Sequence, residues 1–455
     1  AGDAERAGAV CIVSESATDQ GTRLPWVQVR DARRALAALS VEFFEHPSHH
    51  LPVIAVTGTN GKTTTAYLIQ SIFESAGVRC GRIGTIGHQI GSSHQPASLT
   101  TPEASDIQSM LRAMVDGGAG ACVMEASSHA LALHRVDQTR FATAVFTNLT
   151  RDHLDFHGDM NRYFEAKQRL FEMLPKGRPA IVNVDDPRGA TLARTVERPV
   201  TYACRADADV TPGEIEASLT GQRFDVRTPR GGLQVRSELI GEGNTFNILA
   251  AVAAGVALDV PFSAIEAGVA AVEAVPGRFE TVSGEADDVT VVVDFAHTDD
   301  ALRMLLDAAR PLALGRLITV FGCGGDRDRS KRPLMGAVAA RLSDLVVVTS
   351  DNPRSEGPQA IIDEIVGGIE PRRDESGGVL APVRPTGEPT PYLTFVDRGE
   401  AIDHAVREAR GGDVVIVAGR GHERSQVMAN GTVEFDDAEV ARAALARRRS
   451  SSPVS

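Results

Sequence analysis

Short apolar runs that alternate with helical periods constrain this chain more than any other feature. The run at 51–56 (LPVIAV) is followed by a polar, glycine-containing stretch at 57–64, and apolar residues then recur at helical spacing up to Gly77. Strands that alternate with helices form parallel sheets covered by helices on both faces. The chain is therefore predicted to be an α/β protein. Further runs expected to form strands lie at 121–124, 144–146, 180–184, 289–293, 317–321, 345–348 and 414–418.

The spacing of these runs divides the chain into blocks. Residues 1–50 contain one expected strand (9–13) and one expected helix (31–44), which is too little for a complete domain. Residues 51–274 are predicted to form a central domain. A Val-Pro-Gly segment then marks the linker to a third domain at 275–446.

Three further segments have a distinctive composition. Residues 210–240 read as short strands with polar turns, and 371–391 are rich in Pro, Gly and charge, which is typical of a long surface loop. The tail at 447–455 is expected to be disordered because it combines an arginine run with serines.

Charge and cysteine usage exclude several classes of protein. The 455 residues carry 47 basic and 60 acidic side chains, for a net charge of −13, which disfavours a general nucleic-acid binder. No apolar stretch is long enough to cross a bilayer. The five widely spaced cysteines include no CxxC pair, so a reducing compartment is expected. We expect a cytoplasmic monomer without a nucleic-acid partner or membrane insertion.

The stretch at 57–64 reads TGTNGKTT and lies between an expected strand and an expected helix. Backbone N–H groups of such a loop bind phosphates, and the helix N-terminus adds its dipole. Lys62 is placed to reach the terminal phosphates and Thr63 to bind Mg²⁺. The usual loop has a glycine where this chain has Val56, so the loop is a shortened form. ATP is favoured over GTP because no NKxD element is present, and the alternative is a plain glycine-rich turn.

An acidic and histidine set follows two of the expected strands. Glu125 ends one strand, His153 follows the next, and Lys167 lies in a helical stretch. Carboxyl ends of parallel strands meet at one edge, so Glu125 and His153 are expected to join the phosphate loop around Mg²⁺. Two alternatives stay open: Asp152 and Asp155 are either ligands or helix caps, and Lys167 alone is typical of a solvated lysine.

Four polar loops in the third block each follow an apolar run. Arginines suit carboxylates and acids suit ammonium groups, so the set fits a zwitterion if the loops line one crevice. Any one loop alone is an ordinary polar turn. The loops are 294–298 (DFAHT), 322–328 (GCGGDRD), 351–354 (DNPR) and 419–423 (GRGHE), and they present His297, Arg327, Asp351, Arg354, His422 and Glu423.

The motifs in their order resemble those of the Mur ligases. The matching strings are TGTNGKTT, TTPE, MEASSHALALHR, TNLTRDHLDFH, AKQRLF, VPGRFE, GCGGDRDRSKRP, DNPRSE and GRGHE, and they cover nearly the whole chain from about residue 9. The resemblance is strongest to the members that add the third residue to UDP-N-acetylmuramoyl-L-alanyl-D-glutamate. It implies three domains: a UDP-binding N-terminal domain, a central P-loop ATPase with a parallel sheet, and a C-terminal Rossmann-like domain for the incoming amino acid.

The resemblance also implies roles for individual residues. Those expected to bind ATP are Gly58, Thr59, Asn60, Gly61, Lys62, Thr63, Thr64, Asn247, Arg278 and Asp294. Those expected to contact the UDP-muramoyl substrate are Thr100, Thr101, Ser127 and Arg135. Those expected to contact meso-2,6-diaminopimelate are Arg327, Asp351, Asn352, Pro353, Arg354, Gly419 and Glu423. The expected Mg²⁺ ligands are Thr63, Glu125, His153 and Lys167, and the expected catalytic residues are Lys62, Lys167, His153 and Glu125.

The family carbamylates the lysine that Lys167 matches, which turns an amine into an anionic oxygen ligand that Mg²⁺ accepts. The implied reaction is ATP-driven amide formation through an acyl phosphate, with meso-diaminopimelate as the amine. The alternatives are a lysine-adding Mur ligase, a folylpolyglutamate synthase-like ligase and a non-catalytic nucleotide-binding relative. The SSHALALHR and DNPR strings disfavour the synthase. The non-catalytic relative is disfavoured by the intact Lys62, Glu125, His153 and Lys167.

Several positions depart from the family pattern. The N-terminal segment with the uridine-contacting Ser-Arg pair is absent from the sequence, so a truncated uridine site is the expectation. The other departures remove no catalytic group and indicate a divergent member. They are Leu99, Leu133, Gly243, Phe295, Asp299 and Arg420, where the family usually has Asn, Gln, Phe, Tyr, Pro and Lys.

Overall fold

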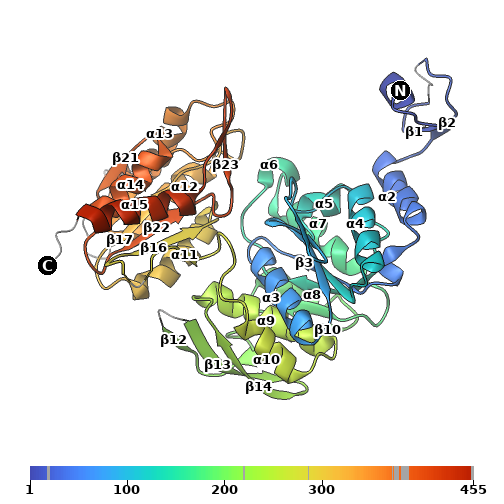
Figure 1. The fold of residues 1–455 in the computed structure, drawn as a ribbon, viewed down its shortest axis with the longest axis horizontal. Helices are drawn as coiled ribbons and strands as arrows, with labels where there is room; N and C mark the ends of the chain where they lie inside the picture. The colour runs from blue at the N-terminus through green and yellow to red at the C-terminus, as the bar shows by residue number, and fades with distance from the viewer. Residues whose placement is uncertain are drawn as a thin grey trace.

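The computed structural model describes residues 1–17, 21–218, 221–284, 286–370, 372–373, 379–380 and 389–451. Two large sheets, each mainly parallel and covered by helices, dominate the described chain (Figure 1). One sheet belongs to the central block and the other to the C-terminal block, with the phosphate loop of the first facing the second. The predicted α/β class is confirmed.

The central sheet has eight strands in the order β10-β9-β8-β3-β7-β4-β5-β6. Its middle strand β3 is buried at all five positions, as expected of a strand covered on both faces. All neighbours pair in parallel except β5 and β6, which form antiparallel pairs at one edge. The strands are β3 (Val53–Thr57), β4 (Cys80–Gly84), β5 (Gly87–Ile90), β6 (Ser93–Gln95), β7 (Ala121–Glu125), β8 (Phe141–Phe146), β9 (Ala180–Asn183) and β10 (Pro199–Tyr202).

Alternation along β3 divides the central core into two layers. Ile54 and Val56 pack in one layer with α3 (Lys62–Ser75), α9 (Glu242–Ala257) and α10 (Phe262–Ala270). Val53 and Ala55 pack in the opposite layer, because successive strand residues point to opposite faces. The helices of that second layer are α4 (Ala104–Asp116), α5 (Ser128–Ala132), α7 (Met160–Glu172) and α8 (Pro187–Ala193).

Helix α10 lies against α3 at a glycine contact, which gives a stability prediction. A Cβ atom on Gly268 would lie 2.4 Å from the Ile72 Cα and 2.6 Å from the Ile72 N. Gly268→Ala must therefore push the two helices apart, and we expect it to lower the free energy of unfolding by about 1–3 kcal/mol. Gly284→Ala is the control, since its Cβ meets no atom within 4 Å. Chemical denaturation of both variants measures the difference, and equal stabilities would contradict this packing.

An antiparallel sheet follows the central one in the chain and contacts α10 (Figure 1). Strand β13 alternates buried and exposed residues over most of its length, as expected when one face packs on the core. The strands predicted within 210–240 are confirmed. They are β11 (Thr211–Pro212), β12 (Glu216–Ser218), β13 (Gly221–Thr228) and β14 (Gly231–Ser237).

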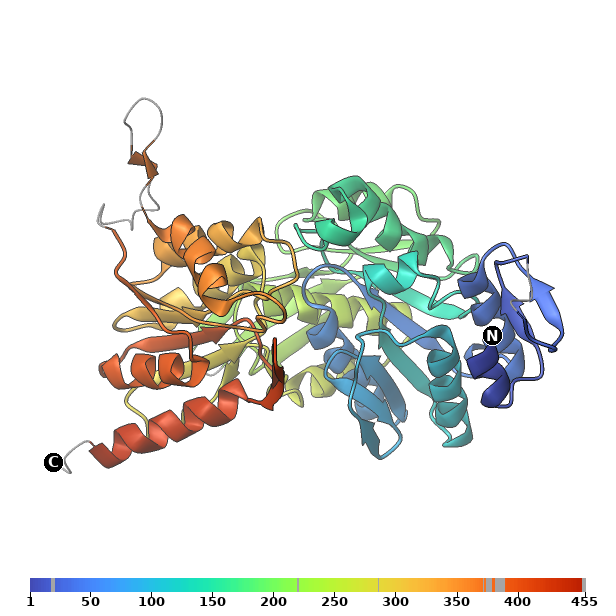
Figure 2. The same cartoon turned by 90° about the horizontal axis from the view of Figure 1, so that it is seen from above.

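The C-terminal sheet has the strand order β15-β16-β22-β17-β18-β21. Only β15 (Glu280–Thr281) is antiparallel to its neighbour. The parallel strands are β16 (Thr290–Asp294), β17 (Leu317–Phe321), β18 (Leu345–Val348), β21 (Tyr392–Thr394) and β22 (Val414–Ala418). One face is covered by α11 (Asp299–Ala309), α12 (Lys331–Leu342) and α13 (Pro358–Ile369), and the other by α14 (Arg398–Glu408) and α15 (Asp437–Ser451). Figure 2 shows α15 along the outer side of this domain.

Two predictions about the C-terminal block need correction. The tail is not disordered from residue 447, because α15 continues to Ser451; residues 452–455 lie outside the described residues. Within the expected loop at 371–391, β19 (Arg372–Arg373) pairs with β20 (Val379–Leu380). Residues 371, 374–378 and 381–388 lie outside the described part of the chain.

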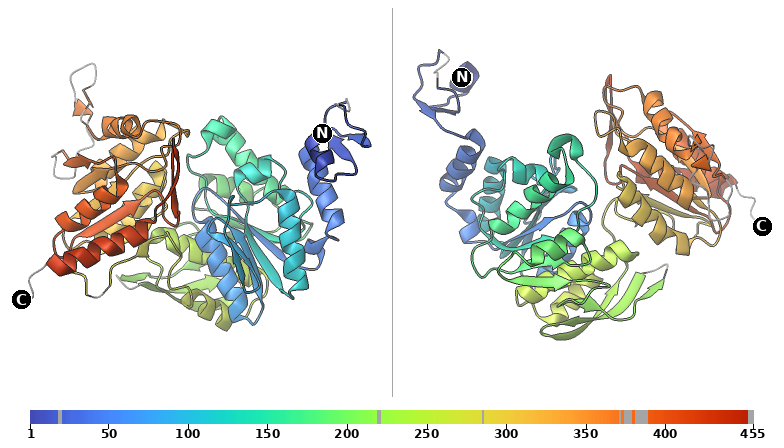
Figure 3. Two further views of the ribbon diagram at one scale, coloured as in Figure 1. Left: turned by 45° about the horizontal axis from the view of Figure 1, so that its top comes forward. Right: turned by 180° about the vertical axis from the view of Figure 1, so that it is seen from behind.

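The N-terminal residues form a small unit at the far side of the central domain from the C-terminal domain (Figure 3). It contains α1 (Gly2–Arg6), the parallel pair β1 (Ile12–Ser14) and β2 (Trp26–Gln28), and α2 (Ala32–Phe43). The predicted strand thus lies slightly later than 9–13, and the predicted helix is confirmed. No helix of the described residues is both long enough and apolar enough to cross a membrane.

Candidate active site

A cavity of about 1020 Å³ opens between the central and C-terminal sheets. The carboxyl ends of strands from both sheets lie at this cavity, and nearly every residue singled out from the sequence lines it. Of the predicted site residues, Gly58, Lys167 and Pro353 do not line it, although Lys167 donates a hydrogen bond to the Gly58 carbonyl of the phosphate loop. The sequence motifs therefore meet in one cleft, and the expected crevice of four C-terminal loops forms its far wall.

The phosphate loop at 58–61 connects β3 to α3 and requires its two glycines. Gly58 has φ 152° and Gly61 has φ 86°. A Cβ on Gly58 would lie 1.8 Å from the Thr147 Oγ1, and one on Gly61 would lie 2.2 Å from the Asn247 Oδ1. Helix α3 then begins at Lys62 without a side-chain cap, which leaves its first N–H groups for a ligand. This backbone suits phosphate oxygens.

Lys62 is the cation of this loop. Its Nζ donates to the carbonyl oxygens of Gly58, at 3.0 Å, and Thr59, at 2.7 Å. Desolvation lowers the pKa of Lys62, and the nearby carboxylates of Glu125 and Asp152 partly oppose that shift. The amine thus lies inside the loop that is expected to receive phosphate.

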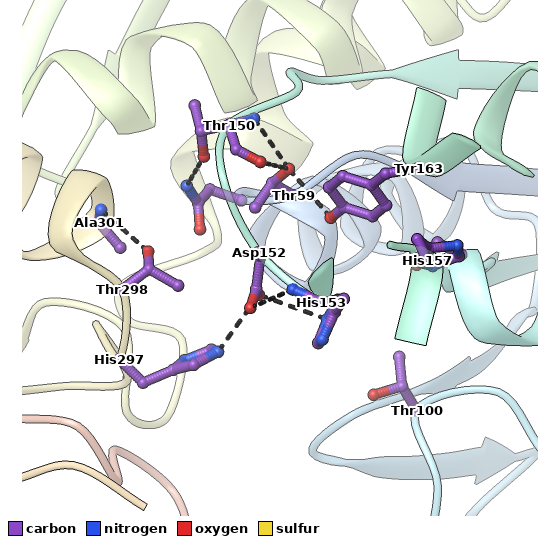
Figure 4. Close-up of polar contacts among 12 residues, drawn as sticks. Thr59, Thr100, Thr150, Asp152, His153, His157, Tyr163, His297, Thr298 and Ala301 are labelled. Carbon is purple, nitrogen blue, oxygen red and sulfur yellow. Dashed lines mark hydrogen bonds and ion pairs between the residues drawn. The ribbon is translucent and has the colours of Figure 1, made fainter. Parts of the chain in front are cut away.

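The segment that follows β8 anchors the phosphate loop. Thr147 Oγ1 donates to the Asn60 carbonyl at 2.6 Å, and Asn60 N donates to the Asn148 Oδ1 at 2.9 Å. Thr59 Oγ1 shares a hydrogen bond of 3.1 Å with the Tyr163 hydroxyl (Figure 4). Sequence reasoning did not single out Thr147, Asn148 or Tyr163. The TNLT string beside the His153 motif was the available signal for the first two.

Glu125 is the last residue of β7 and is 1% exposed. Its Oε2 accepts hydrogen bonds from the Thr63 Oγ1, at 3.1 Å, and the Thr85 Oγ1, at 2.9 Å. Its Oε1 accepts from the Thr85 N at 2.8 Å. The carboxylate is therefore held toward the start of α3. Thr85 carries no motif in the sequence, and only the fold shows its role.

Lys167 lies on α7 with 1% of its surface exposed, so the interpretation as a solvated lysine is wrong. Its Nζ donates to the Gly58 carbonyl at 2.7 Å and lies 4.5 Å from the centroid of the Tyr163 ring. Burial, and then the charge of Lys62, lower the pKa of Lys167 well below its usual value. A buried amine thus contacts the backbone of the phosphate loop.

His153 follows β8 in a left-handed conformation, with φ 54°, immediately before α6 (Leu154–His157). Asp152 Oδ1 accepts a hydrogen bond from the His153 N at 2.8 Å. Asp152 Oδ2 lies 3.3 Å from the His153 Nε2 and 3.6 Å from the His297 Nε2 of the C-terminal domain (Figure 4). Desolvation lowers the pKa of His153 to about 3. Neither Asp152 nor Asp155 caps α6 with its side chain, so the cap interpretation is wrong.

The described side chains do not by themselves form a metal-ligand cluster. No group of three or more His, Cys, Asp and Glu among the described residues has the geometry to hold a metal ion. Glu125 and His153 thus need further oxygen ligands to make a Mg²⁺ site, because Mg²⁺ prefers oxygen.

A set of hydroxyl and cationic groups lines the cleft beside Glu125. Thr101 Oγ1 donates to the Glu125 carbonyl at 2.7 Å and accepts from the Ser127 N at 3.0 Å. Arg135 Nη1 donates to the Thr101 carbonyl at 3.2 Å, and the Thr100 Oγ1 lies 3.1 Å from the Thr85 Oγ1. The four residues predicted to contact the UDP-muramoyl substrate are therefore close together.

The C-terminal wall of the cleft carries an amide, an acid and an arginine. Asn352 Nδ2 donates to the Glu423 Oε2 at 2.7 Å. Arg354, which has φ 54°, donates from Nη1 to the Gly325 carbonyl at 2.7 Å. Arg420, fully buried, donates to the Asn352 Oδ1 at 3.1 Å and so fixes the orientation of that amide. Desolvation, and then the nearby Asp351 carboxylate, raise the pKa of Glu423.

The segment between the two sheets reaches the phosphate loop. Arg278 Nη2 donates to the Thr63 Oγ1 at 3.3 Å, and its guanidinium carbon lies 4.4 Å from the Phe295 ring centroid. Asp294 Oδ2 accepts from the Phe279 N at 2.6 Å. The predicted linker residues therefore contact both walls of the cleft.

Comparisons with known proteins agree with this arrangement. Residues 56–255 match the Mur ligase middle domain, and residues 277–421 match the Mur ligase glutamate ligase domain. The UDP-N-acetylmuramoyl-L-alanyl-D-glutamate--2,6-diaminopimelate ligase of Gloeobacter violaceus is 46% identical over 439 residues, which cover 96% of this chain and 86% of the relative. The protein of the same name from Solibacter usitatus is 47% identical over 450 residues, with 98% and 87% covered.

Solved structures show the same fold. A UDP-N-acetylmuramoyl-L-alanyl-D-glutamate--2,6-diaminopimelate ligase superposes with a TM-score of 0.66 and 34% identity, over 99% of this chain and 89% of that one. MurF ligase from Thermotoga maritima in complex with ADP gives a TM-score of 0.66 at 18% identity, over 98% of this chain and 91% of that one, and shows the fold alone.

Proposed function

The chain belongs to the Mur ligase family, and we propose that it joins meso-2,6-diaminopimelate to UDP-N-acetylmuramoyl-L-alanyl-D-glutamate at the expense of ATP, in peptidoglycan precursor synthesis. The relatives at 46–47% identity carry the name of this activity. The observation that carries the proposal is the pairing of a phosphate loop on one wall of the cleft with Asn352, Arg354 and Glu423 on the other.

ATP is the proposed phosphate donor. The loop at 58–61, the uncapped start of α3 and the Lys62 amine form a cradle, and the close approach of Thr147 and Asn247 leaves no room for a Cβ atom at Gly58 or Gly61. Asn247, Arg278 and Asp294 extend that wall toward the linker and line the same cleft, which supports their predicted role beside the nucleotide. Fixed charge and backbone dipoles in such a site stabilise the transferring phosphoryl group.

Mg²⁺ is the proposed metal, and its proposed ligands are Thr63, Glu125, His153 and a carbamylated Lys167. The bonded pair of Thr63 and Glu125 supplies oxygen donors beside the phosphate loop, and His153 lines the same cleft. When bound, the ion neutralises charge on phosphate oxygens. The neutral Lys167 amine would attack CO₂, so that an N–C bond forms, a proton leaves and a carboxylate results. That product would supply the oxygen ligand that an amine lacks.

The reaction proceeds in two balanced steps. The D-glutamyl carboxylate takes the γ-phosphoryl group, which gives an acyl phosphate and ADP. The free amine of diaminopimelate then attacks the acyl carbon, a C–N bond forms, the amine nitrogen loses a proton, and phosphate leaves with the electron pair of the broken C–O bond. Thr100, Thr101, Ser127 and Arg135 would hold the UDP-linked substrate beside Glu125. Two walls that enclose the reacting groups limit hydrolysis of the intermediate by water.

The residues of the cleft described above come from one chain, which supports the proposal that the enzyme acts as a monomer. ATP and nucleotide-linked precursors are supplied in the cytoplasm, and we propose that the enzyme acts there.

The folylpolyglutamate synthase of Mycobacterium tuberculosis shares the fold at 18% identity and a TM-score of 0.67. A likeness at this identity shows the fold alone and does not support synthase activity for this chain.

Arg354 tests the assignment of the amino acid. Its planar guanidinium fits the second carboxylate of diaminopimelate, which L-lysine lacks. Arg354→Ala is expected to cost at least about 2 kcal/mol in kcat/KM for diaminopimelate, the lower end for loss of one partner of a charge pair. Arg424→Ala is the control, because that nearby arginine is 87% exposed. Steady-state phosphate release measures both variants, and an unchanged kcat/KM in Arg354→Ala would contradict the proposed contact.

A further inference from the structure

A buried arginine joins the two loops that form the proposed diaminopimelate pocket. Arg332 lies on α12 with none of its surface exposed. Its guanidinium donates to both carboxylate oxygens of Glu356, at 2.8 and 2.9 Å, and to the Gly324 carbonyl at 3.2 Å. Gly324 belongs to the GCGGDRD loop and Glu356 to the segment that follows DNPR. One side chain therefore holds both loops at once.

Glu356 also contacts the GCGGDRD loop directly. Its Oε1 accepts a hydrogen bond from the Asp326 N at 2.6 Å. The Asp326 side chain in turn accepts from the Ser355 N, at 3.2 Å, and from the Ser355 Oγ, at 2.7 Å. The two loops are thus fastened reciprocally, each by the side chain of the other. The Arg332 hydrogen bond lowers the pKa of Glu356 to about 2, so that Glu356 is ionised near neutral pH.

Both loops contain a residue in a conformation that side chains rarely adopt. Asp326 has φ 52° and Arg354 has φ 54°. Such conformations are unfavourable and persist where the surrounding structure over-determines them. The Arg354 Nη1 atom lies 2.7 Å from the Gly325 carbonyl oxygen, directly beside Asp326. The direction of the Arg354 guanidinium therefore depends on the backbone that Glu356 and Arg332 hold.

We propose that Arg332 and Glu356 are positioning residues that aim Arg354 and so set selectivity for an amino acid with a second carboxylate. The inference rests on the proposed function for the identity of that amino acid. Two parallel N–H···O bonds between a guanidinium and a carboxylate require an aligned fork. Misplacement by about 1 Å can cost about 10²-fold in rate, so loosening these loops weakens recognition although Arg354 itself is retained.

Glu364 provides a matched control. It accepts from the same Arg332 Nη1 atom at 2.9 Å and also pairs with Arg329, so it shares the buried guanidinium. It lies on α13, and its described hydrogen bonds go to Arg329 and Arg332 rather than to the pocket loops. Glu364→Gln therefore removes one of the two carboxylates that pair with Arg332. It leaves in place the hydrogen bonds by which Arg332 and Glu356 join the two loops.

The experiment compares Glu356→Ala, Glu356→Gln and Glu364→Gln in the full chain. Initial rates of phosphate release give KM and kcat for diaminopimelate, L-lysine, ATP and UDP-N-acetylmuramoyl-L-alanyl-D-glutamate, and thermal unfolding reports stability. In Glu356→Ala we expect KM for diaminopimelate to rise by about tenfold or more, since misplacement of about 1 Å is costly. The ratio of kcat/KM between diaminopimelate and L-lysine should fall in parallel, and the other two KM values should stay within about twofold. Glu356→Gln retains an acceptor for Asp326 and should lie between Glu356→Ala and wild type.

Glu364→Gln should keep the wild-type selectivity. An equal loss of selectivity in Glu364→Gln and Glu356→Ala, or a loss in Glu356→Ala spread over all substrates, would overturn the inference. If wild type prefers L-lysine, the proposed function fails separately. The positioning role is then decided by whether the Glu356 variants raise KM for L-lysine while Glu364→Gln does not.

Discussion

Lys167→Ala is expected to reduce ligation by about 10³-fold while the fold is retained, a loss comparable to removing one electrostatic stabiliser of a transition state. Lys167 is buried against the phosphate loop, where its Nζ donates to the Gly58 carbonyl. Alanine offers no nitrogen to form a carbamate and hence no oxygen for the metal. Added bicarbonate should not restore activity, because it has no amine to react with.

Lys167→Met separates chemistry from packing in this experiment. Methionine keeps an unbranched apolar stem of similar length and fills the space, yet it cannot be carbamylated. We expect it to be as inactive as Lys167→Ala. Lys176→Ala is the surface control, since Lys176 is exposed. Phosphate release at saturating Mg²⁺ and chemical denaturation give the two readouts. Turnover near the wild-type rate in either Lys167 variant would show that Lys167 is not a metal ligand.

Lys62→Ala is expected to abolish ATP turnover with every amino acid tested, by about 10³-fold or more, in the range seen when a single cation is removed from phosphoryl transfer. The Lys62 ammonium lies within the loop that cradles the phosphates, where it donates to the Gly58 and Thr59 carbonyls. No other lysine among the described residues lies in this loop. The developing charge would therefore lose the cation that lies within this loop.

The two lysine variants should differ in how they respond to ligands. Lys62→Ala should weaken binding of ATP in calorimetry at any Mg²⁺ concentration. Lys167→Ala should retain nucleotide binding and instead require more Mg²⁺. Phosphate formed at the normal rate by Lys62→Ala would place ATP at a different site in the cleft.

The sequence predicted the sheets and the edge where their loops meet, for a simple physical reason. Burial on both faces gives continuous apolar runs such as 53–57, and parallel strands bring all their carboxyl ends to one edge. Placing Glu125 and His153 near the phosphate loop needed only these two rules. Their distances and partners depended on segments far apart in the chain.

Residues that act through distant partners could not be predicted. Thr85 lies in none of the motifs, and the GCGGDRDRSKRP string that contains Arg332 assigns it no role, because the hydrogen bonds of both residues cross between separate segments. The composition of the arginine-rich tail predicts disorder, but the acidic partners of its arginines lie far away in the chain. Arg448 pairs with Asp288 at 2.7 Å and Arg447 with Asp403 at 2.8 Å, which extends α15 along the C-terminal domain. Local composition does not contain that information.

The choice between cap and ligand for Asp152 shows the same limit. The sequence pattern leaves Asp152 as either a metal ligand or a helix cap, whereas the structure places its carboxylate between His153 of the central domain and His297 of the C-terminal domain (Figure 4). A contact between domains has no signature in either segment alone.

The central claim, that this ligase adds meso-diaminopimelate, is tested most directly by its choice of amino acid. Phosphate release is measured with ATP, Mg²⁺ and UDP-N-acetylmuramoyl-L-alanyl-D-glutamate, with either meso-diaminopimelate or L-lysine as the amine, and mass spectrometry identifies the product. Arg354 lines the cleft at the position proposed for a second carboxylate. Bound L-lysine would leave this arginine without a carboxylate partner, and the lost hydrogen bonds would weaken its binding. We predict rapid release and a diaminopimelyl product with the first amino acid and feeble turnover with the second. Equal or faster turnover with L-lysine would contradict the account.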